Sequence, residues 1–518
     1  MTNRGLSLGR WRAVLSWSLL ACILLLLHGL SFHFMVDDAF ISFRYAHNLV
    51  TGHGLVFNPG ERVEGYSNLL WVLLVAGGLK VGLPALLWAR ILGAVCTLAT
   101  LAMLPGIVRR MDPDHEVRSP WAGRVAQLLV AATGAVACWS LAGLETPLFG
   151  LLIVLAWRSA LARSPLQAGV AGLLMVLTRP EGPALALIFQ GWSLLPPPGL
   201  APARSPWRRA KTWVGPAVLL AGTAAFFLWR RHYFGWWLPN TYYAKTGDLK
   251  GQLATGLPYG LAFARAYLVI PFLVAVGVLM RCGRRRLRSP DVLAGLGVML
   301  FWWSYVVVVG GDMLGMYRFF APVLPLITTW LVGLAVPCGW FDRKLGLALF
   351  TLVMVASLLP ASFTGHERRL VTIHMSEANL GGWITAGDAL ADRLPPDTTL
   401  ALGPAGYIPW KTGLVCYDFY GLVDPRIAHR EVAFTHHYAG HEKHDADLVL
   451  ARRPDYILLG NVDVTTGPRT GPTVVLDREM DIYNHPDFKR DYVRMAMPLG
   501  GGKYLNMFQR RDLRGGRR

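Results

Sequence analysis

Long apolar runs separated by short polar loops dominate the first 362 residues of the chain. Eleven of these runs are long enough, or nearly long enough, to cross a hydrocarbon core of roughly 30 Å as helices. They cover approximately residues 13–34, 87–108, 122–142, 146–162, 165–178, 182–198, 213–230, 257–280, 291–309, 319–338 and 345–362. A further apolar stretch at 69–86 is interrupted by glycine, lysine and proline, and these breaks favour an interfacial or re-entrant segment.

The pattern changes after residue 362, where short β-like runs alternate with turns and polar helical pieces. The strand-like runs are TLALG at 399–403, DYILLG at 455–460, TVVLD at 473–477 and KYLNMF at 503–508. We therefore predict a polytopic α-helical membrane domain over residues 1–362 and a soluble α/β domain over residues 363–518, a normal size for one domain.

Composition agrees with a membrane location. Of the residues, 53% are hydrophobic and 16% are charged, whereas a soluble domain carries roughly a quarter charged residues. The net charge of +19 would suit a nucleic-acid-binding protein, but no such module is recognisable. The arginines instead gather in short loops after alternate apolar runs, as the positive-inside rule requires of cytoplasmic loops. We expect a multi-pass protein of the inner membrane with an uncleaved N-terminal anchor, a cytoplasmic N-terminus and residues 363–518 in the periplasm.

Two adjacent carboxylates, Asp37 and Asp38, follow the first apolar run. Charge is costly where a helix leaves the hydrocarbon unless it has a partner or a task. Neighbouring carboxylates raise each other's pKa, which favours one of them as a general base near neutral pH. The alternative is that the pair only ends the helix, although the long charged loop that follows is more than a helix end needs.

The stretch DDAFISFRYAHNLVTGHGLVFNPGERVEGYSNLLW at 37–71 resembles the first extracytoplasmic loop of GT-C superfamily glycosyltransferases, in particular the arabinofuranosyltransferase-like branch. Further pieces match the same pattern in chain order. They are GLETPLF at 143–149, TRPEG at 178–182, PNTYYAK at 239–245, GGDMLGMYRFFAP at 310–322 and GLVDPRIA at 421–428.

This resemblance implies a GT-C-like fold and a polyprenyl-phosphate sugar donor used on the outer face of the membrane, with Asp37 and Asp38 as the catalytic candidates. It implies a pentofuranose such as arabinofuranose, and a cell-envelope glycan, lipid or protein as the acceptor. Some GT-C enzymes use a divalent metal ion, for which Asp37 or Asp38 would be the ligand, and the residues leave metal dependence open.

A lipid-phosphate donor carries its own leaving group, so the site needs a base and cations that hold the phosphate more than it needs a strong acid. Arg179 is the best candidate cation, because the run at 165–178 is too short to span the core and leaves this residue below the outer surface. For every such cation the alternative to phosphate binding is a structural role, as a snorkelling or ion-paired residue at the membrane interface. We expect Asp312 and Arg318 to pair with each other. The candidate contacts to donor phosphate and sugar are Arg44, Tyr45, Arg62, Glu64, Tyr66, Asn68, Glu145, Arg179, Glu181, Asn240, Tyr243, Lys245, Asp312 and Arg318.

The predicted α/β domain offers weaker candidates. Tyr407, Asp418 and Asp424 place polar groups in an otherwise apolar stretch and are candidates for acceptor binding, while a packed core with turn aspartates explains them equally well. The histidines at 436, 437, 441 and 444 resemble a metal site, although a solvated surface explains them better.

Two other kinds of function remain open. A lipid-linked sugar flippase would explain the proline-interrupted apolar run at 165–198, but the chain lacks two matching halves. A non-catalytic envelope or motility regulator with a transferase-like shell is the second alternative.

Overall fold

The computed structural model describes residues 8–32, 35–111, 121–196, 210–269, 272–273, 276–277, 280, 290–335, 348, 351–352, 355, 373–431, 442–470, 475–476 and 479–515. The chain divides into two compact units. The first contains Met1–Phe34, Ala89–Phe226 and Leu253–Ile373, and the second contains Met35–Trp88, Phe227–Gln252 and His374–Arg518. The second unit therefore combines most of the predicted α/β domain with two segments from between the apolar runs.

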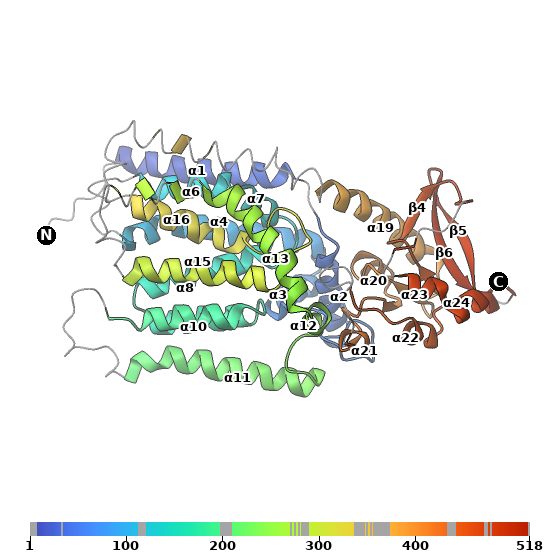
Figure 1. The fold of residues 1–518 in the computed structure, drawn as a ribbon. Helices are drawn as coiled ribbons and strands as arrows, with labels where there is room; N and C mark the ends of the chain where they lie inside the picture. The colour runs from blue at the N-terminus through green and yellow to red at the C-terminus, as the bar shows by residue number, and fades with distance from the viewer. Residues whose placement is uncertain are drawn as a thin grey trace. The chain divides into compact units, whose positions relative to one another are not determined.

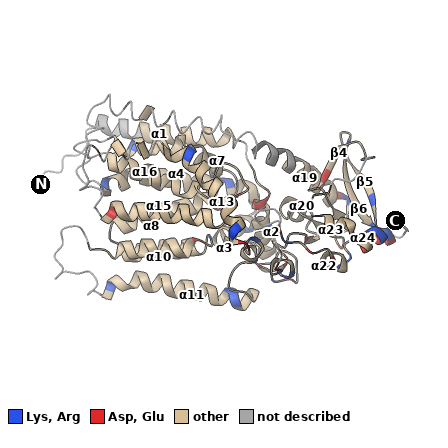
Figure 2. Cartoon of the chain, in the orientation of Figure 1, with Lys and Arg blue, Asp and Glu red and all other residues tan. Residues whose placement is uncertain are grey.

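Apolar helices make up the first unit and its connections to the second (Figure 1). They are α1 (Leu8–Leu30), α4 (Ala85–Met111), α6 (Ala122–Ala132), α7 (Gly134–Ser140), α8 (Thr146–Leu161), α9 (Pro165–Val176), α10 (Gly182–Ser193), α11 (Val214–Phe234), α13 (Leu249–Phe263), α15 (Pro290–Val308) and α16 (Leu324–Ala335). Figure 2 shows that these helices carry few charged residues along their length. Helices α8, α9 and α10 each have a proline in their first turn, where the missing N–H costs nothing.

These helices correspond to the predicted crossings. A described helix overlaps each of the first ten predicted runs, while the run at 345–362 lies largely outside the described residues. Within the described part of the chain, Ala85–Met111, Ala210–Phe234 and Pro290–Val308 are long and apolar enough to cross a membrane, and α6 with α7 would do so as a pair bent by 68°. The count of eleven crossings stays a prediction. Helix α3 (Leu69–Lys80), with 12 residues, is about 18 Å long and too short to cross alone.

Small residues let the helices of the first unit approach closely. A Cβ atom on Gly169 of α9 or on Gly215 of α11 would overlap main-chain atoms of the other helix. A Cβ on Gly182 would overlap the carbonyl group of Met175, so the tight turn from α9 to α10 requires glycine there. This turn carries Arg179 and Glu181.

The second unit is built on a six-stranded mixed sheet. Its strands are β1 (Thr399–Leu402), β2 (Val415–Asp418), β3 (Tyr456–Leu458), β4 (Asp463–Thr466), β5 (Tyr492–Gly500) and β6 (Lys503–Arg510). The order is β2-β1-β3-β6-β4, with β5 on the other side of β6, as Figure 1 shows for β4, β5 and β6. β1 pairs in parallel with β2 and β3, and β6 pairs antiparallel with β3, β4 and β5. Three of the predicted strand-like runs thus form β1, β3 and β6.

Short helices accompany this sheet. They are α2 (Asp38–Val50), α12 (Asn240–Lys245), α19 (Ile373–Arg393), α20 (Tyr407–Thr412), α21 (Pro425–Ala428), α22 (Ala446–Ala451), α23 (Met480–Asn484) and α24 (Pro486–Asp491). Phe419, Ile427, Ile457, Ile482 and Phe508 are buried in the apolar core between helices and strands. Helices α2, α3 and α12 come from outside residues 363–518, yet they belong to the same compact unit.

Candidate active site

The carboxyl group of Asp37 lies against the start of helix α20. Its Oδ2 accepts a hydrogen bond from the Gly406 N–H at 2.9 Å, and its Oδ1 accepts one from the Tyr407 N–H at 2.7 Å. A Cβ atom on Gly406 would overlap both the main-chain oxygen and the carboxyl group of Asp37. The approach therefore depends on a glycine at position 406.

The environment of Asp37 brings its pKa to about 7. Burial is the largest cause and raises the pKa, and the charge of Asp38 raises it further. The hydrogen bonds from the Tyr407 and Gly406 N–H groups oppose the shift, because they stabilise the carboxylate. The residue stays partly accessible to solvent. A carboxylate with this pKa exchanges protons near neutral pH, which is the property of an efficient general base.

Arg44, on helix α2, makes contacts with the main chain. Its guanidinium donates to the carbonyl oxygens of Phe57 at 2.6 Å, Leu414 at 2.7 Å and Pro409, and to Oδ1 of Asn58 at 3.1 Å. The side chain is buried. Through these contacts Arg44 joins the first loop to the segment around α20. Because its donors are already used there, a role of Arg44 in phosphate binding stays a prediction.

The loop after α2 is held by Tyr45 and by a buried ion pair. The Tyr45 hydroxyl donates to the Val63 carbonyl at 2.6 Å and accepts from the Gly65 N–H at 2.8 Å. Between these contacts, Oε2 of Glu64 lies 2.8 Å from Nε of Arg230, with side chains exposed by 2% and 6%. Burial raises the pKa of Glu64 to about 7, although the Arg230 guanidinium opposes the shift. Sequence analysis missed Arg230, even though a charged residue ending an apolar run was a usable signal.

The remaining candidates of this loop have different surroundings. The ring of Tyr66 packs edge-on against Tyr45 with centroids 4.7 Å apart, and its buried hydroxyl has no hydrogen-bond partner among the described residues. Asn68 exchanges hydrogen bonds with the Ser42 hydroxyl at 3.1 and 3.2 Å. The guanidinium of Arg62 lies 4.8 Å from the centroid of the Tyr233 ring.

Asn240 joins three of the predicted motifs. Its side-chain amide donates to the carbonyl oxygens of Gly421 at 2.7 Å and Leu422 at 2.9 Å, and its main-chain N–H donates to the Glu64 carbonyl at 2.9 Å. Tyr243 packs against His429 with centroids 4.0 Å apart, and Lys245 is exposed. The segments 61–66, 239–245 and 421–428 are thus brought together although they are far apart in the sequence.

The acceptor candidates have the contacts of turn and cap residues. The Tyr407 hydroxyl donates to Asp388 at 2.9 Å. Asp418 accepts from main-chain N–H groups at 2.8 and 3.1 Å, and burial raises its pKa to about 7. Asp424 caps α21 and pairs with Arg452 at 2.8 Å. These contacts favour the structural explanation, and acceptor binding by these residues stays a prediction.

The first unit gathers the other charged candidates. Nη1 of Arg179 lies 2.9 Å from Oε1 of Glu145, and its Nε lies 2.5 Å from Oε1 of Glu181. The Tyr305 hydroxyl donates to Oε2 of Glu181 at 3.3 Å. All three charged side chains are almost completely buried, so the motifs GLETPLF and TRPEG meet through a buried ion-pair network.

Arg318 lies beside this network. It forms a two-point contact with Asp312, with Nε–Oδ2 at 2.7 Å and Nη2–Oδ1 at 2.9 Å, which confirms the predicted pair. The ring of Phe319 has the guanidinium of Arg179 at 5.3 Å and that of Arg318 at 5.2 Å from its centroid. We refer to Glu145, Arg179, Glu181, Asp312 and Arg318 as the charge cluster.

The loop that carries Arg318 has an unusual backbone. Met316 and Tyr317 have φ angles of 54° and 47°, in the left-handed region that non-glycine residues rarely adopt. Indole N–H groups hold the loop, because Trp139 donates to the Met316 carbonyl at 3.0 Å and Trp302 donates to the Phe319 carbonyl at 2.8 Å. Strain of this kind is common at functional sites.

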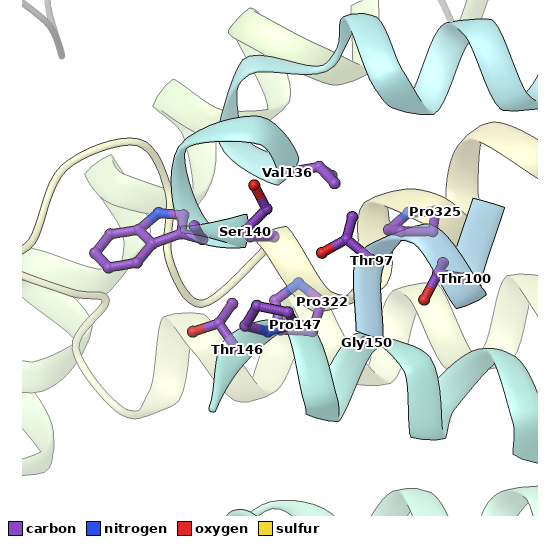
Figure 3. A pocket seen from close by; sticks show the side chains of 11 residues that line it. Thr97, Thr100, Val136, Ser140, Thr146, Pro147, Gly150, Pro322 and Pro325 are labelled. Carbon is purple, nitrogen blue, oxygen red and sulfur yellow. The ribbon is translucent and has the colours of Figure 1, made fainter. Parts of the chain in front are cut away.

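Figure 3 shows a pocket of the first unit. Trp139 is one of its lining residues, and the guanidinium of Arg318 lies 5.9 Å from the centroid of the Trp139 ring. The hydroxyl groups of Thr97, Thr100 and Ser140 donate to carbonyl oxygens of their own helices, so the pocket is lined mostly by carbon atoms. The lining residues are Thr97, Thr100, Val136, Trp139, Ser140, Thr146, Pro147, Gly150, Ala321, Pro322 and Pro325.

Metal binding is not decided by these contacts. Across the described segments, no group of three or more His, Cys, Asp or Glu side chains is arranged to hold a metal ion. His436, His437 and His441 lie outside the described residues, and Nδ1 of His444 lies 2.7 Å from Asp481. Metal binding by Asp37 or Asp38 stays a prediction.

The chain has a fold of the GT-C type. The chain is similar to the crystal structure of ArnT from Cupriavidus metallidurans bound to undecaprenyl phosphate, with a TM-score of 0.57 over 99% of this chain and 100% of that chain. The identity is 13%, so this likeness is one of fold. Residues 372–508 match a family described as a domain of unknown function, DUF8728.

Among curated proteins, the chain is similar to two terminal beta-(1->2)-arabinofuranosyltransferases. The protein of Mycobacterium tuberculosis is 31% identical over 278 residues, covering 49% of this chain and 42% of the relative. The protein of Corynebacterium glutamicum is 28% identical over 352 residues, covering 59% of this chain and 48% of the relative. The chain thus spans about half the length of the curated relatives it matches, and the predicted resemblance to the arabinofuranosyltransferase-like branch is confirmed.

Proposed function

We propose that this protein is a glycosyltransferase that transfers a pentofuranose, such as arabinofuranose, from a polyprenyl-phosphate carrier to a cell-envelope glycan, lipid or protein. The observation that carries the proposal is the geometry of Asp37, a partly accessible carboxyl group beside a second aspartate, whose two oxygens are held by the N–H groups of Gly406 and Tyr407. The similarity to arabinofuranosyltransferases and the fold shared with ArnT support the same reaction class.

In this proposal Asp37 is the general base. Its carboxylate takes the proton of the acceptor hydroxyl while the acceptor oxygen bonds to the anomeric carbon of the donor. The bond from that carbon to the phosphate oxygen breaks, and polyprenyl phosphate leaves with the electron pair. Asp38 does not take the proton but raises the pKa of Asp37 through its charge.

The charge cluster supplies the cations for the lipid phosphate. Arg179 and Arg318 are the two guanidinium groups, and both lie against Phe319. Three carboxylates pair with these guanidinium groups, so phosphate binding requires an exchange with part of these contacts.

The protein acts in this proposal from the inner membrane, with a cytoplasmic N-terminus and residues 363–518 in the periplasm. The arginine-rich loops support this orientation through the positive-inside rule. A lipid-linked donor is then reached from the membrane, and the acceptor from the periplasm.

Mass spectrometry of envelope glycans and surface proteins, in cells with and without this protein, tests the function. We expect the loss of one pentose residue from a defined acceptor when the protein is absent. Accumulation of an intact lipid-linked pentose on the cytoplasmic leaflet would instead favour a flippase. Unchanged glycans and lipid-linked sugars would leave the non-catalytic regulator as the better explanation.

A further inference from the structure

The residues that contact the Asp37 carboxylate come from the domain of unknown function. Both carboxylate oxygens accept main-chain N–H groups, one from Gly406 and one from Tyr407. These two residues lie within the matched segment 372–508, and Asp37 lies more than three hundred residues earlier in the chain. Main-chain donors have no rotamer freedom, so they orient a carboxylate more rigidly than side chains do.

Contacts on both sides of these donors hold them in place. At the start of α20, the Tyr407 ring packs edge-on against Phe40 with centroids 4.9 Å apart. At its other end, Arg44 donates to the carbonyl oxygens of Pro409 and Leu414. Because Phe40 and Arg44 both belong to α2, the helix that follows Asp37 is joined to α20 at both ends of α20.

We propose that Gly406 and Tyr407 are positioning residues for the catalytic Asp37, and that one role of the C-terminal domain is to complete the catalytic site of the first loop. This inference rests on the proposed function. It assigns the domain a task in the chemical step that is separate from presenting an acceptor.

The two N–H groups fix the direction of both carboxylate oxygens of Asp37. Removing one of them should therefore slow the chemical step without weakening donor binding. A merely structural contact would not produce this split between kcat and KM.

The main test is Gly406→Ala in the full-length protein, assayed with a polyprenyl-phosphate pentose. The added methyl group displaces the Asp37 carboxylate. We expect kcat to fall at least about tenfold, because a displaced general base takes the proton less efficiently, while the KM for the donor stays unchanged. The matched control is Gly381→Ala, because Gly381 lies in helix α19 with open space where the methyl group would be; its kinetics should equal those of the wild type.

A second pair of variants tests the inference if Gly406→Ala does not fold. Tyr407 is the first residue of α20, where proline is tolerated in a helix. Tyr407→Pro removes the N–H group and the ring, and Tyr407→Ala removes the ring alone. The loss of kcat should be larger in Tyr407→Pro than in Tyr407→Ala, with the same KM for the donor in both variants.

The outcomes separate the inference from the proposed function. A wild-type kcat in Gly406→Ala, or equal kcat values in the two Tyr407 variants, would overturn the positioning role while leaving the transferase intact. A wild-type protein that transfers no pentose from any polyprenyl-phosphate donor would overturn the proposed function itself.

Discussion

The side chain of Asn58 pairs with both main-chain polar groups of Cys416. Its Oδ1 accepts the Cys416 N–H at 3.1 Å, and its Nδ2 donates to the Cys416 carbonyl at 3.0 Å. Cys416 lies in β2, the strand at one edge of the sheet. A side-chain amide therefore satisfies the main-chain N–H and carbonyl groups of an edge strand, as a neighbouring strand would do. The same contact joins the first loop to the sheet.

Asn58→Asp should destabilise the second unit. A carboxylate still accepts the Cys416 N–H, but it cannot donate to the Cys416 carbonyl, so two buried oxygens face each other. We expect a loss of about 1–3 kcal/mol of unfolding free energy, the cost of an unsatisfied buried group, measured by thermal unfolding in detergent. Asn484→Asp is the control, because Asn484 is exposed. Equal melting temperatures for the two variants would contradict the pairing.

Asp38→Asn should move the acid limb of the pH–rate profile to lower pH. The charge of Asp38 raises the pKa of Asp37, so its removal lowers that pKa and makes the base available in more acidic solution. Asp37→Asn should abolish the limb and reduce turnover by at least about a hundredfold. The measurement is kcat/KM between pH 5 and pH 9. A hundredfold loss in Asp38→Asn, with near-normal turnover in Asp37→Asn, would reverse the two roles.

Arg230→Met should unfold at a markedly lower temperature than the wild type. The substitution leaves Glu64 buried without its cation, and removing one partner of a buried ion pair costs about 3–5 kcal/mol. The double variant Arg230→Met with Glu64→Gln should recover part of the loss, because the uncompensated charge is gone. Arg231→Met is the matched control, since this neighbouring residue is exposed. A double variant less stable than Arg230→Met would refute the buried-charge explanation.

Arg179→Met should lose binding of undecaprenyl phosphate together with stability. The variant removes one of the two guanidinium groups near Phe319 and leaves Glu145 and Glu181 without their cation. Native mass spectrometry with added lipid phosphate measures the binding. Arg163→Met separates the two effects, because Arg163 forms an ion pair with Asp291 at 2.8 Å outside the charge cluster; it should lower stability and keep the lipid. Equal lipid retention by both variants would remove Arg179 from the donor site.

Reporter fusions test the proposed orientation. A reporter that is active only outside the cytoplasm should work when fused after residue 45, 250 or 400, and should fail after residue 115, 205 or 286. The reason is the distribution of arginines among the loops. An inactive reporter in a stably produced fusion after residue 400 would reverse the orientation of the C-terminal domain.

Several features of this protein follow from local sequence alone. The apolar runs predict helices because a helix satisfies all of its backbone hydrogen bonds within one segment of the membrane core, and described helices overlap ten of the runs. The pair of Asp312 and Arg318 was predictable because these residues are close in the sequence, on one loop. The acidic pair of Asp37 and Asp38, and the motif at 37–71 that contains it, were recognisable from the sequence.

Other features were decided only by the tertiary structure. Asp37 with Gly406, Asn58 with Cys416 and Glu64 with Arg230 join positions that are separated by 166 to 369 residues along the chain. No periodicity links such positions, because each contact depends on the path of the whole chain and on hydrogen-bond geometry within a few tenths of an ångström. For the same reason Arg44 and Asp424 were candidate ligand contacts in the sequence, whereas in the folded protein main-chain groups and an arginine already occupy their polar atoms.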